Sequence, residues 1–445
     1  MIQKYRKTVE FYLFLLFPAL LSAAPPSDSG ELAAYRSLVR DYSHELKSSG
    51  YSREMYAELT DRAEAEFYPS LQGGGSFQYT GNPLSLNKEI PGLSQPLTFT
   101  GQHEKYGVNL SLSQPIYTGG ALKGNYEKAK YEQTSAGYRI EQTLNDITYD
   151  ADCRYWTAVA SRELTDVARH YRESVDMLVG VVRHRVEVEF ADRNDLLMAL
   201  VKLNNADYLL KQAENSAEVA RLSLNSLAGV PFDEHISTDS VVIPLNAAAL
   251  PAGDASADMR PELKIAGLQT DIRRAEGKIA MSEYMPKFSL HVDGSYSSPG
   301  YDFEKDLSPN YAVYVNLSVP LFEWGKRRNT RKATDYQISM AEEYAAGLGE
   351  RISLEIQTAR YNFEQAAEQV ELTESSLANA AESEELSLHQ YREGLISIVE
   401  VINAQVYHYQ AKQNYIAAKL NAQMARCAYA RAAGHYAEWL EADKK

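Results

Sequence analysis

The chain has 445 residues, and its 60 acidic and 45 basic side chains give a formal net charge of −15 at pH 7. That balance argues against binding to nucleic acid, because binding to the phosphate backbone requires a concentrated cationic surface. The length would fit two or three ordinary domains, but one pattern of residues recurs in both halves of the chain. This repetition predicts a single elongated unit instead.

Residues 1–24 have the order of a secretory signal peptide. Basic side chains at the start precede an apolar run from Phe11 to Leu21, and the small residues Ser22-Ala23-Ala24 precede Pro25. The run is too short for a permanent transmembrane helix, and no run of 18 or more apolar residues follows it. No cysteine lies near the cleavage point, so a lipid anchor is not expected there. We therefore expect any membrane insertion of the mature chain to be by strands.

Residues 25–231 form the first structural repeat. Its helical pattern must end before Pro69, because a proline disfavours helix in the residue before it. Two stretches in which apolar and polar residues alternate follow, and alternation is typical of strands with one apolar face. A proline-free helical stretch of about 100 Å comes next, and no compact domain needs such a rod. The expected elements are a helix over 32–67, strands over 70–80 and 105–115, a long helix over 119–188 and a shorter helix over 194–227.

The long helix carries a heptad seam, which predicts side-by-side packing with other helices. The seam residues are Leu164, Ala168, Tyr171, Val175, Leu178 and Val182.

The second repeat, residues 260–434, is marked by a junction that occurs twice. An alternating strand stops at Pro115 and a long helix opens after Gly120; Pro320 and Gly325 repeat this junction. Residues 232–259 are a linker with one possible short strand over 240–244, and residues 435–445 are a C-terminal tail. The expected elements are a helix over 261–285, strands over 287–298 and 311–320, a long helix over 325–391 and a helix over 397–433.

The helix lengths predict how the rod is assembled. Each long helix descends the whole rod, and its mate must return as two shorter helices stacked end to end. The lengths favour 194–227 with 261–285, and 397–433 with 32–67, since each sum is roughly 65 residues or about 100 Å.

The four strands cannot close a barrel within one chain. Barrels need about eight or more strands, and an open edge in lipid leaves backbone groups unpaired. Three copies would supply about twelve strands, wide enough for a water-filled interior. A soluble sandwich is the alternative, but two isolated hairpins on long rods have no partner sheet in the chain.

The whole mature chain resembles the TolC-type outer-membrane factors. The resemblance rests on the duplicated helix–strand–strand–helix plan and on three segments: Leu224-Asn-Ser-Leu-Ala-Gly-Val-Pro231, Arg260-Pro-Glu-Leu263 and Tyr391-Arg-Glu-Gly-Leu-Ile-Ser-Ile-Val-Glu-Val401. It implies a mixed α and β membrane protein, a homotrimer with a twelve-stranded β-barrel continuous with a twelve-helix periplasmic α-barrel. Such proteins lie in the outer membrane and extend into the periplasm. They are exit ducts of tripartite efflux pumps and type I secretion systems, served by an inner-membrane transporter and a periplasmic adaptor.

The resemblance places adaptor docking at the two turns between a long helix and its returning partner. Gly394, Leu395 and Ser397 match the family pattern in the second turn. The first turn departs from it, with Glu189 at the glycine position and Asp192 at the serine or threonine position. A simple helix cap would explain Gly394 alone.

Two further groups of residues follow from the resemblance. Glu382 and Glu385 fall near the level of the acidic periplasmic constriction, although a solvated acidic helix face fits them equally, and Ala381 replaces the family's arginine. Tyr117, Phe322 and Trp324 are expected in an aromatic girdle at the inner membrane face. The basic residues that follow are interfacial anchors near lipid head groups or an ordinary charged helix start; they are Lys326, Arg327, Arg328, Arg331 and Lys332.

No enzymatic site is expected. The nine histidines show no metal-ligand spacing, no GxSxG or phosphate loop is present, and no cofactor is implied. Cys153 and Cys427 are expected to be packed thiols rather than a bridge. The rival interpretation is a periplasmic coiled-coil adaptor or structural envelope protein without a pore. The sequence leaves the transported substrate open, and with it the choice between efflux and type I secretion.

Overall fold

The computed structural model describes residues 30–89, 91, 96–246, 249–250, 255–301, 305–434 and 436. The expected signal peptide lies outside these residues, as does the expected C-terminal tail apart from Tyr436. The helices are α1 (Gly30–Tyr42), α2 (His44–Ala65), α3 (Ala121–Glu187), α4 (Arg193–Ala228), α5 (Pro261–Ser282), α6 (Lys326–Arg392) and α7 (Ile398–Ala433), with a short 3-10 helix, η2 (Ala257–Met259). The strands are β1 (Ser70–Tyr79), β2 (Ser85–Lys88), β3 (Leu97–Thr100), β4 (Glu104–Tyr117), β5 (Lys287–Ser298) and β6 (Ser308–Ser318).

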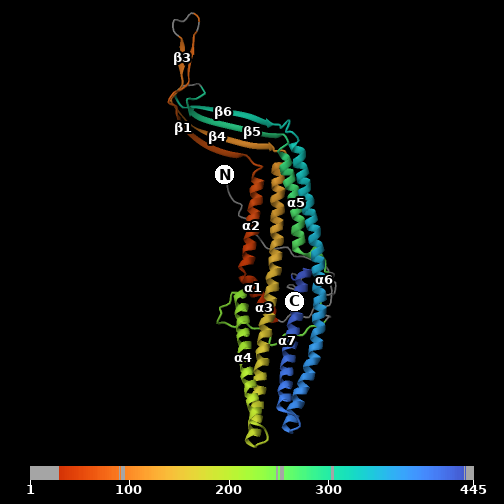
Figure 1. The fold of residues 1–445 in the computed structure, drawn as a ribbon. Coiled ribbons are helices and arrows are strands. Elements are labelled where there is room, and N and C mark those ends of the chain that lie inside the picture. Colours follow the sequence, from red (N-terminus) through yellow and green to blue (C-terminus); the bar gives the residue numbers. More distant parts are fainter. Residues whose placement is uncertain are drawn as a thin grey trace.

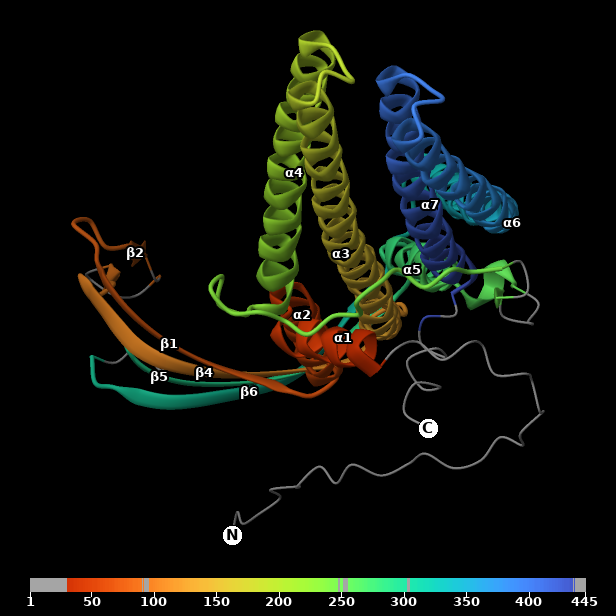
Figure 2. The same cartoon turned by 90° about the horizontal axis from the view of Figure 1, so that it is seen from below.

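The molecule is a long helical rod with a curved sheet at one end (Figure 1). The far half of the rod consists of two helix pairs, α3 with α4 and α6 with α7, which stand side by side when seen from below (Figure 2). Helices α3 and α6 have 67 residues each, which is about 100 Å at 1.5 Å per residue. No helix in the described part of the chain is long and apolar enough to cross a membrane.

The duplication is regular at the level of single residues. Helices α4 and α7 have 36 residues each, and α2 and α5 have 22 each. Corresponding residues of α3 and α6, and of α4 and α7, have residue numbers that differ by 205. For example, α3 begins at 121 and α6 begins at 326. The residue numbers of α2 and α5 differ by 217, since α2 begins at 44 and α5 begins at 261. The first repeat therefore holds 12 more residues between β1 and β4, where the extra hairpin of β2 and β3 projects from the sheet (Figure 1).

The expected helix over 32–67 is two helices, and the single-helix prediction is wrong. Ser43 leaves the helical conformation at φ −47° and ψ 115°, and its side chain accepts a hydrogen bond from the Leu46 amide at 3.2 Å. A serine that caps a new helix offers its own oxygen to an amide that would otherwise lack a partner. The chain therefore ends α1 and begins α2 within one residue.

The short helices stack end to end as expected, but the expected choice of partners is wrong, because the partners are interchanged. The Tyr35 hydroxyl donates to the Leu224 carbonyl at 3.0 Å, which sets α1 and α2 above the end of α4. The Arg260 guanidinium donates to the Ala432 carbonyl at 3.0 Å, which sets α5 above the end of α7 (Figure 1). Equal lengths of α4 and α7 make both arrangements fit, so only these contacts distinguish them.

The core lies where these helix ends meet. The largest cluster of buried apolar side chains includes Leu32, Tyr155, Trp156 and Leu224. An ion pair is buried beside it: Arg36 donates to both carboxylate oxygens of Asp152, at 2.6 and 2.8 Å. Five of the six heptad-seam residues of α3 are buried, from Ala168 to Val182, and Leu164 packs against the core cluster, so the expected side-by-side packing is confirmed.

The sheet is antiparallel in the order β1-β4-β5-β6. Its register places apolar side chains in rows: Leu71 pairs with Leu112, Leu112 with Val292 and Val292 with Val313. The neighbouring row is polar and consists of Gln72, Ser111, Asp293 and Ala312. One face is therefore apolar across all four strands and the other is mainly polar, as the alternation predicts.

Several strand boundaries differ from the expected ones. Strand β4 continues through Pro115 to Tyr117, because an irregularity in the register between these residues lets the strand pass the proline. Strand β6 begins at Ser308 and ends at Ser318, before Pro320. The possible strand over 240–244 does not form. There the Val242 amide donates to the Glu163 carboxylate at 2.9 Å instead of joining a sheet.

Candidate functional site at the helical tip

The two turns at the far end of the rod have the same backbone. In the first turn the Phe190 amide donates to the Arg185 carbonyl at 2.8 Å, and in the second the Leu395 amide donates to the Gln390 carbonyl at 2.9 Å. Glu189 and Gly394 precede these amides with φ of 62° and 78°. Both turns are thus Schellman-type helix ends with a left-handed residue.

Glu189 adopts the left-handed conformation although it has a side chain, which costs about 1–2 kcal/mol relative to a right-handed residue. Glu189 therefore has the backbone conformation of the glycine in the second turn, although it is not a glycine. Asp192 and Ser397 stand at the N-cap positions of the returning helices. The Asp192 carboxylate accepts from the backbone amide of Asn194, whereas the Ser397 hydroxyl donates to the Glu400 carboxylate and caps no backbone amide. All five residues expected at the docking turns lie in these two turns.

Each turn exposes a large apolar side chain immediately after its left-handed residue. Phe190 is 77% exposed and Leu395 is 73% exposed. The two residues correspond, because their numbers differ by the constant spacing of 205. The sequence analysis identified Leu395 and missed Phe190, because the first turn lacks the glycine that marks the pattern. Alignment of the two turns at the constant spacing of 205 would have found it.

A groove of about 870 Å³ lies between the two turns. Its lining is partly apolar and partly basic: Met177, Gly180, Val181, His184, Arg185, Phe190, Arg392 and Glu393. Apolar area combined with cationic groups suits an amphipathic helix that carries acidic side chains.

Arg185 joins the two helix pairs at this groove. Its guanidinium donates to the Tyr391 carbonyl at 2.5 Å and lies over the Tyr391 ring, 4.7 Å from the ring centre. Burial raises the pKa of the Tyr391 hydroxyl, and the nearby Arg185 charge opposes that shift. Behind the ring, Leu178, Val182 and Ile398 form a shared apolar cluster. The tips are therefore packed against each other within one chain.

Glu382 and Glu385 are exposed on α6, 12 and 9 residues before Gly394. Glu384, the residue just before Glu385, makes contacts that the sequence did not reveal. Glu384 accepts a hydrogen bond from the Ser174 hydroxyl of α3 at 2.9 Å and pairs with His408 of α7. These residues lie on three helices, and Ser174 is 210 residues from Glu384, so no local pattern marks them.

The aromatic residues expected at the membrane interface lie where the sheet meets the rod. Tyr117 ends β4, and Phe322 and Trp324 lie between β6 and α6 with their ring centres 4.9 Å apart. Trp324 is 89% exposed, with the backbone in the left-handed region at φ 46°. Within the described residues no ring contact joins Tyr117 to the other two, and no group of histidine, cysteine and carboxylate side chains could hold a metal ion.

Two curated relatives are similar to this chain in sequence. The alkaline protease secretion protein AprF of Pseudomonas aeruginosa is 24% identical over 241 residues, which are 52% of this chain and 50% of that protein. The outer membrane protein TolC of Salmonella enteritidis is 19% identical over 382 residues, covering 83% of this chain and 74% of that protein. The chain thus aligns with about half the length of the first relative and about three quarters of the second.

Solved channel structures share the fold. The outer-membrane channel OprN matches with a TM-score of 0.79 at 15% identity, covering 94% of each chain. The CmeC outer membrane channel of Campylobacter jejuni matches with a TM-score of 0.78 at 16% identity, covering 97% of this chain and 94% of that one. The fold of the chain is accordingly that of outer-membrane channels.

The profile of one protein family covers nearly the whole described chain. It is described as "Outer membrane efflux protein" and matches residues 36–230 and 254–435, which include both long helices, the four-stranded sheet and both tip turns. The chain therefore belongs to the outer membrane efflux protein family.

Proposed function

We propose that three copies of the chain form an exit duct of the outer membrane, which receives its substrates from an inner-membrane transporter and a periplasmic adaptor. The observation that carries this proposal is the open sheet, whose edges are β1 and β6 and whose one face is apolar along all four strands. In lipid an open edge leaves backbone groups unpaired, so β1 must pair with β6 of another copy. Three copies of four strands give twelve, which surround a water-filled interior.

The rod supports the same assembly. At each level of the rod four helices lie side by side: α2, α3, α5 and α6 near the sheet, and α4, α3, α7 and α6 near the tip. Three copies would close a twelve-helix tunnel of about 100 Å below the barrel. The edge helices carry exposed apolar side chains, among them Leu197 and Tyr208 on α4 and Leu354 and Tyr361 on α6.

The tip supports adaptor docking. Phe190 and Leu395 are apolar side chains held outward by rigid turns, and exposed apolar side chains of this kind mark protein contacts. The groove between them adds a basic wall. We place the adaptor's helical hairpin at Gly394, Leu395, Ser397, Glu189 and Asp192, and an acidic periplasmic constriction at Glu382 and Glu385.

Two substrate classes remain open to this duct. The family description names efflux, and one relative is named for secretion of an alkaline protease. A trimer with a polar interior serves either purpose, because the transporter selects the cargo. The aromatic residues Tyr117, Phe322 and Trp324 would lie at the inner membrane face and contact outer-membrane lipid.

Planar-bilayer recording on the purified protein tests the proposal. A trimer that resists dissociation in mild detergent and conducts ions in a planar lipid bilayer is the expected result. A single copy that conducts no ions would overturn the duct and favour a periplasmic structural protein without a pore.

A second measurement tests the docking site. Phe190→Asn and Leu395→Asn should each abolish cross-linking to the adaptor in whole cells, while the purified variants stay trimeric and conduct ions. Val188→Asn, which changes an exposed apolar residue just before the left-handed position, is the matched control and should leave cross-linking unchanged. Retained cross-linking in both tip variants would place the adaptor elsewhere.

A further inference from the structure

Helix α6 has two apolar faces, and the chain covers only one of them. Ile352 and Val370 are buried against α7 and the linker, and they are 18 residues apart, which is five helical turns. Tyr336, Leu354 and Leu372 have the same 18-residue spacing and are exposed. They follow the buried set by two residues, or about 200° around the helix. The exposed stripe therefore lies opposite the packed face.

Helix α2 is the other edge of the rod near the sheet. Thr60 and Ala63 are buried on its α3 side, whereas Tyr51, Met55 and Leu59, each four residues from the next, are exposed. Among the described elements, α3 makes the main contact with α2. In a closed ring of three copies, which is the assembly proposed above, α6 of one copy must meet α2 of the next.

The internal repeat predicts the register of that meeting. Adding 205 to the number of a residue in α3 gives its counterpart in α6, and subtracting 217 from the number of a residue in α5 gives its counterpart in α2. Burial agrees with both numbers: a side chain at Gly277 of α5 would touch Thr334 of α6, and the corresponding residues of α2 and α3 are Thr60 and Ala129. All four positions are buried. The α3–α5 contact inside one chain is thus the template for an α6–α2 contact between chains.

One ion pair of the template translates into a second ion pair. Lys278 donates to the Glu127 carboxylate at 2.7 Å across the α3–α5 contact. Adding 205 to 127 gives Lys332, and subtracting 217 from 278 gives Asp61. The signs are exchanged between the helices, and the charges remain opposite. Neither Lys332 nor Asp61 has an ion-pair partner within the described part of the chain.

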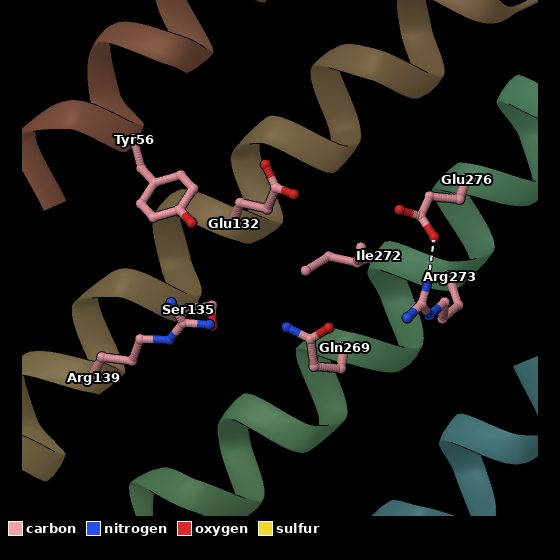
Figure 3. Close-up of a pocket in the computed structure, with 8 residues that line it drawn as sticks. All are labelled: Tyr56, Glu132, Ser135, Arg139, Gln269, Ile272, Arg273 and Glu276. Atoms are coloured by element: carbon pink, nitrogen blue, oxygen red, sulfur yellow. Dashed lines mark hydrogen bonds and ion pairs between the residues drawn. The ribbon is translucent and has the colours of Figure 1, made fainter. Parts of the chain in front are cut away.

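The rest of the template is mainly polar, and its counterpart is apolar. A cavity of about 140 Å³ lies between α2, α3 and α5 (Figure 3), where the Ser135 hydroxyl is buried without a hydrogen-bond partner. Figure 3 shows Ser135 and Arg139 of α3 on one side of this cavity and Ile272 and Glu276 of α5 on the other. Their counterparts are, in the same order, Met340, Tyr344, Met55 and Leu59, and all four of these apolar side chains are exposed. The correspondence between the repeats thus brings the exposed apolar residues of α6 against those of α2.

We infer that the contact between subunits below the membrane is built by α6 of one copy and α2 of the partner subunit, with Lys332 paired to Asp61 of the partner subunit and Met340 packed on the partner's Met55. The inference rests on the proposed trimer. It also gives Lys332 a protein partner, in contrast to a role in binding lipid phosphate.

Disulfide cross-linking tests the register directly. The double variant Asp61→Cys with Lys332→Cys should yield covalent dimers and trimers on a non-reducing gel after mild oxidation. Asp61→Cys with Arg331→Cys is the matched control, because Arg331 is adjacent but lies about 100° away around α6. It should give at least several-fold less cross-linked product. The parent chain, with Cys153 and Cys427, reports background. Equal yields from both pairs, or none from either in a protein that is trimeric, would overturn the inference while leaving the trimer intact.

Charge reversal separates a protein partner from a lipid partner. Lys332→Asp and Asp61→Lys should each lower the temperature at which the trimer dissociates, since every trimer would gain three like-charged contacts. The double reversal should restore the parent temperature. If Lys332→Asp weakens the trimer and Asp61→Lys does not rescue it, Lys332 binds lipid phosphate and the proposed pair is wrong. A protein that is never trimeric would refute the proposed function itself.

Discussion

The apolar row of the sheet makes a quantitative prediction for Val292→Arg. Val292 pairs with Leu112 on one side and with Val313 on the other, so its side chain lies in the middle of the face that would contact lipid. A guanidinium at that position has to leave water or distort the lipid around it. The matched control is Ser295→Arg, three residues along the same strand, on the polar face between Asn109 and Asn310.

The depth of Val292 sets the size of the effect. It lies five residues after Lys287, the start of β5, which is about 17 Å along a strand at 3.4 Å per residue. A tilt of about 40° reduces this to about 13 Å along the barrel axis, close to the middle of an apolar band about 25 Å tall. An arginine at the midplane costs about 2–4 kcal/mol. That cost lowers the ratio of folded to unfolded protein about 30-fold to 700-fold per subunit.

The assay is urea unfolding of the parent and both variants in the same lipid vesicles, followed by tryptophan fluorescence. Val292→Arg should lose about 2–4 kcal/mol per subunit, and Ser295→Arg should lie within about 1 kcal/mol of the parent. Equal losses in the two variants would refute the assignment of this face to lipid. A larger loss in Ser295→Arg would mean that the sheet is inserted with the opposite face outward.

Three further predictions concern the rod. Glu189→Gly should slow hydrogen exchange at the first tip turn by relieving a cost of about 1 kcal/mol, whereas Gly394→Ala should speed exchange at the second; unchanged exchange in both would contradict the strain. Burial alone would raise the pKa of Glu262, but its hydrogen bonds from Arg260 outweigh burial and lower that pKa below its ordinary value of 4.5. The stabilisation from this pair should therefore be complete above pH 4.5 and be lost as the pH falls through the lowered pKa, and Glu262→Gln should remove that acid-dependent part from thermal melts. Burial raises the pKa of Cys153 from 9.0 to about 11, so its alkylation at pH 8 should be about 100-fold slower in the native than in the unfolded protein, measured by mass spectrometry; equal rates would show an accessible thiol.

Local patterns in the sequence were sufficient where one element carries the whole signal. The alternation of Leu290, Val292 and their polar neighbours predicts a strand with one apolar face, and the register confirms that face. The heptad seam of α3 predicts burial, and five of its six residues are buried. Both signals arise within one element, because side-chain direction follows directly from the strand or helix repeat.

Other features depend on competition that a pattern does not show. Ser43 has ordinary helix-forming neighbours, and only the balance between continuing α1 and capping α2 breaks the helix there. The left-handed Glu189 is similar, because the paired tip holds a conformation that a glutamate alone would avoid. In both cases the surrounding structure outweighs the preference of the residue.

The sequence by itself determined the duplication, the long helices, the faces of the strands and the positions of the two tip turns, because each depends on spacing along the chain. Only the tertiary structure decided which short helix stands on which, since α4 and α7 have equal length and the hydrogen bonds of Tyr35 and Arg260 select one arrangement. It also decided which faces of α2 and α6 stay uncovered. Those faces depend on contacts between helices that are remote in sequence, and burial is a property of the packed helices together rather than of any one of them.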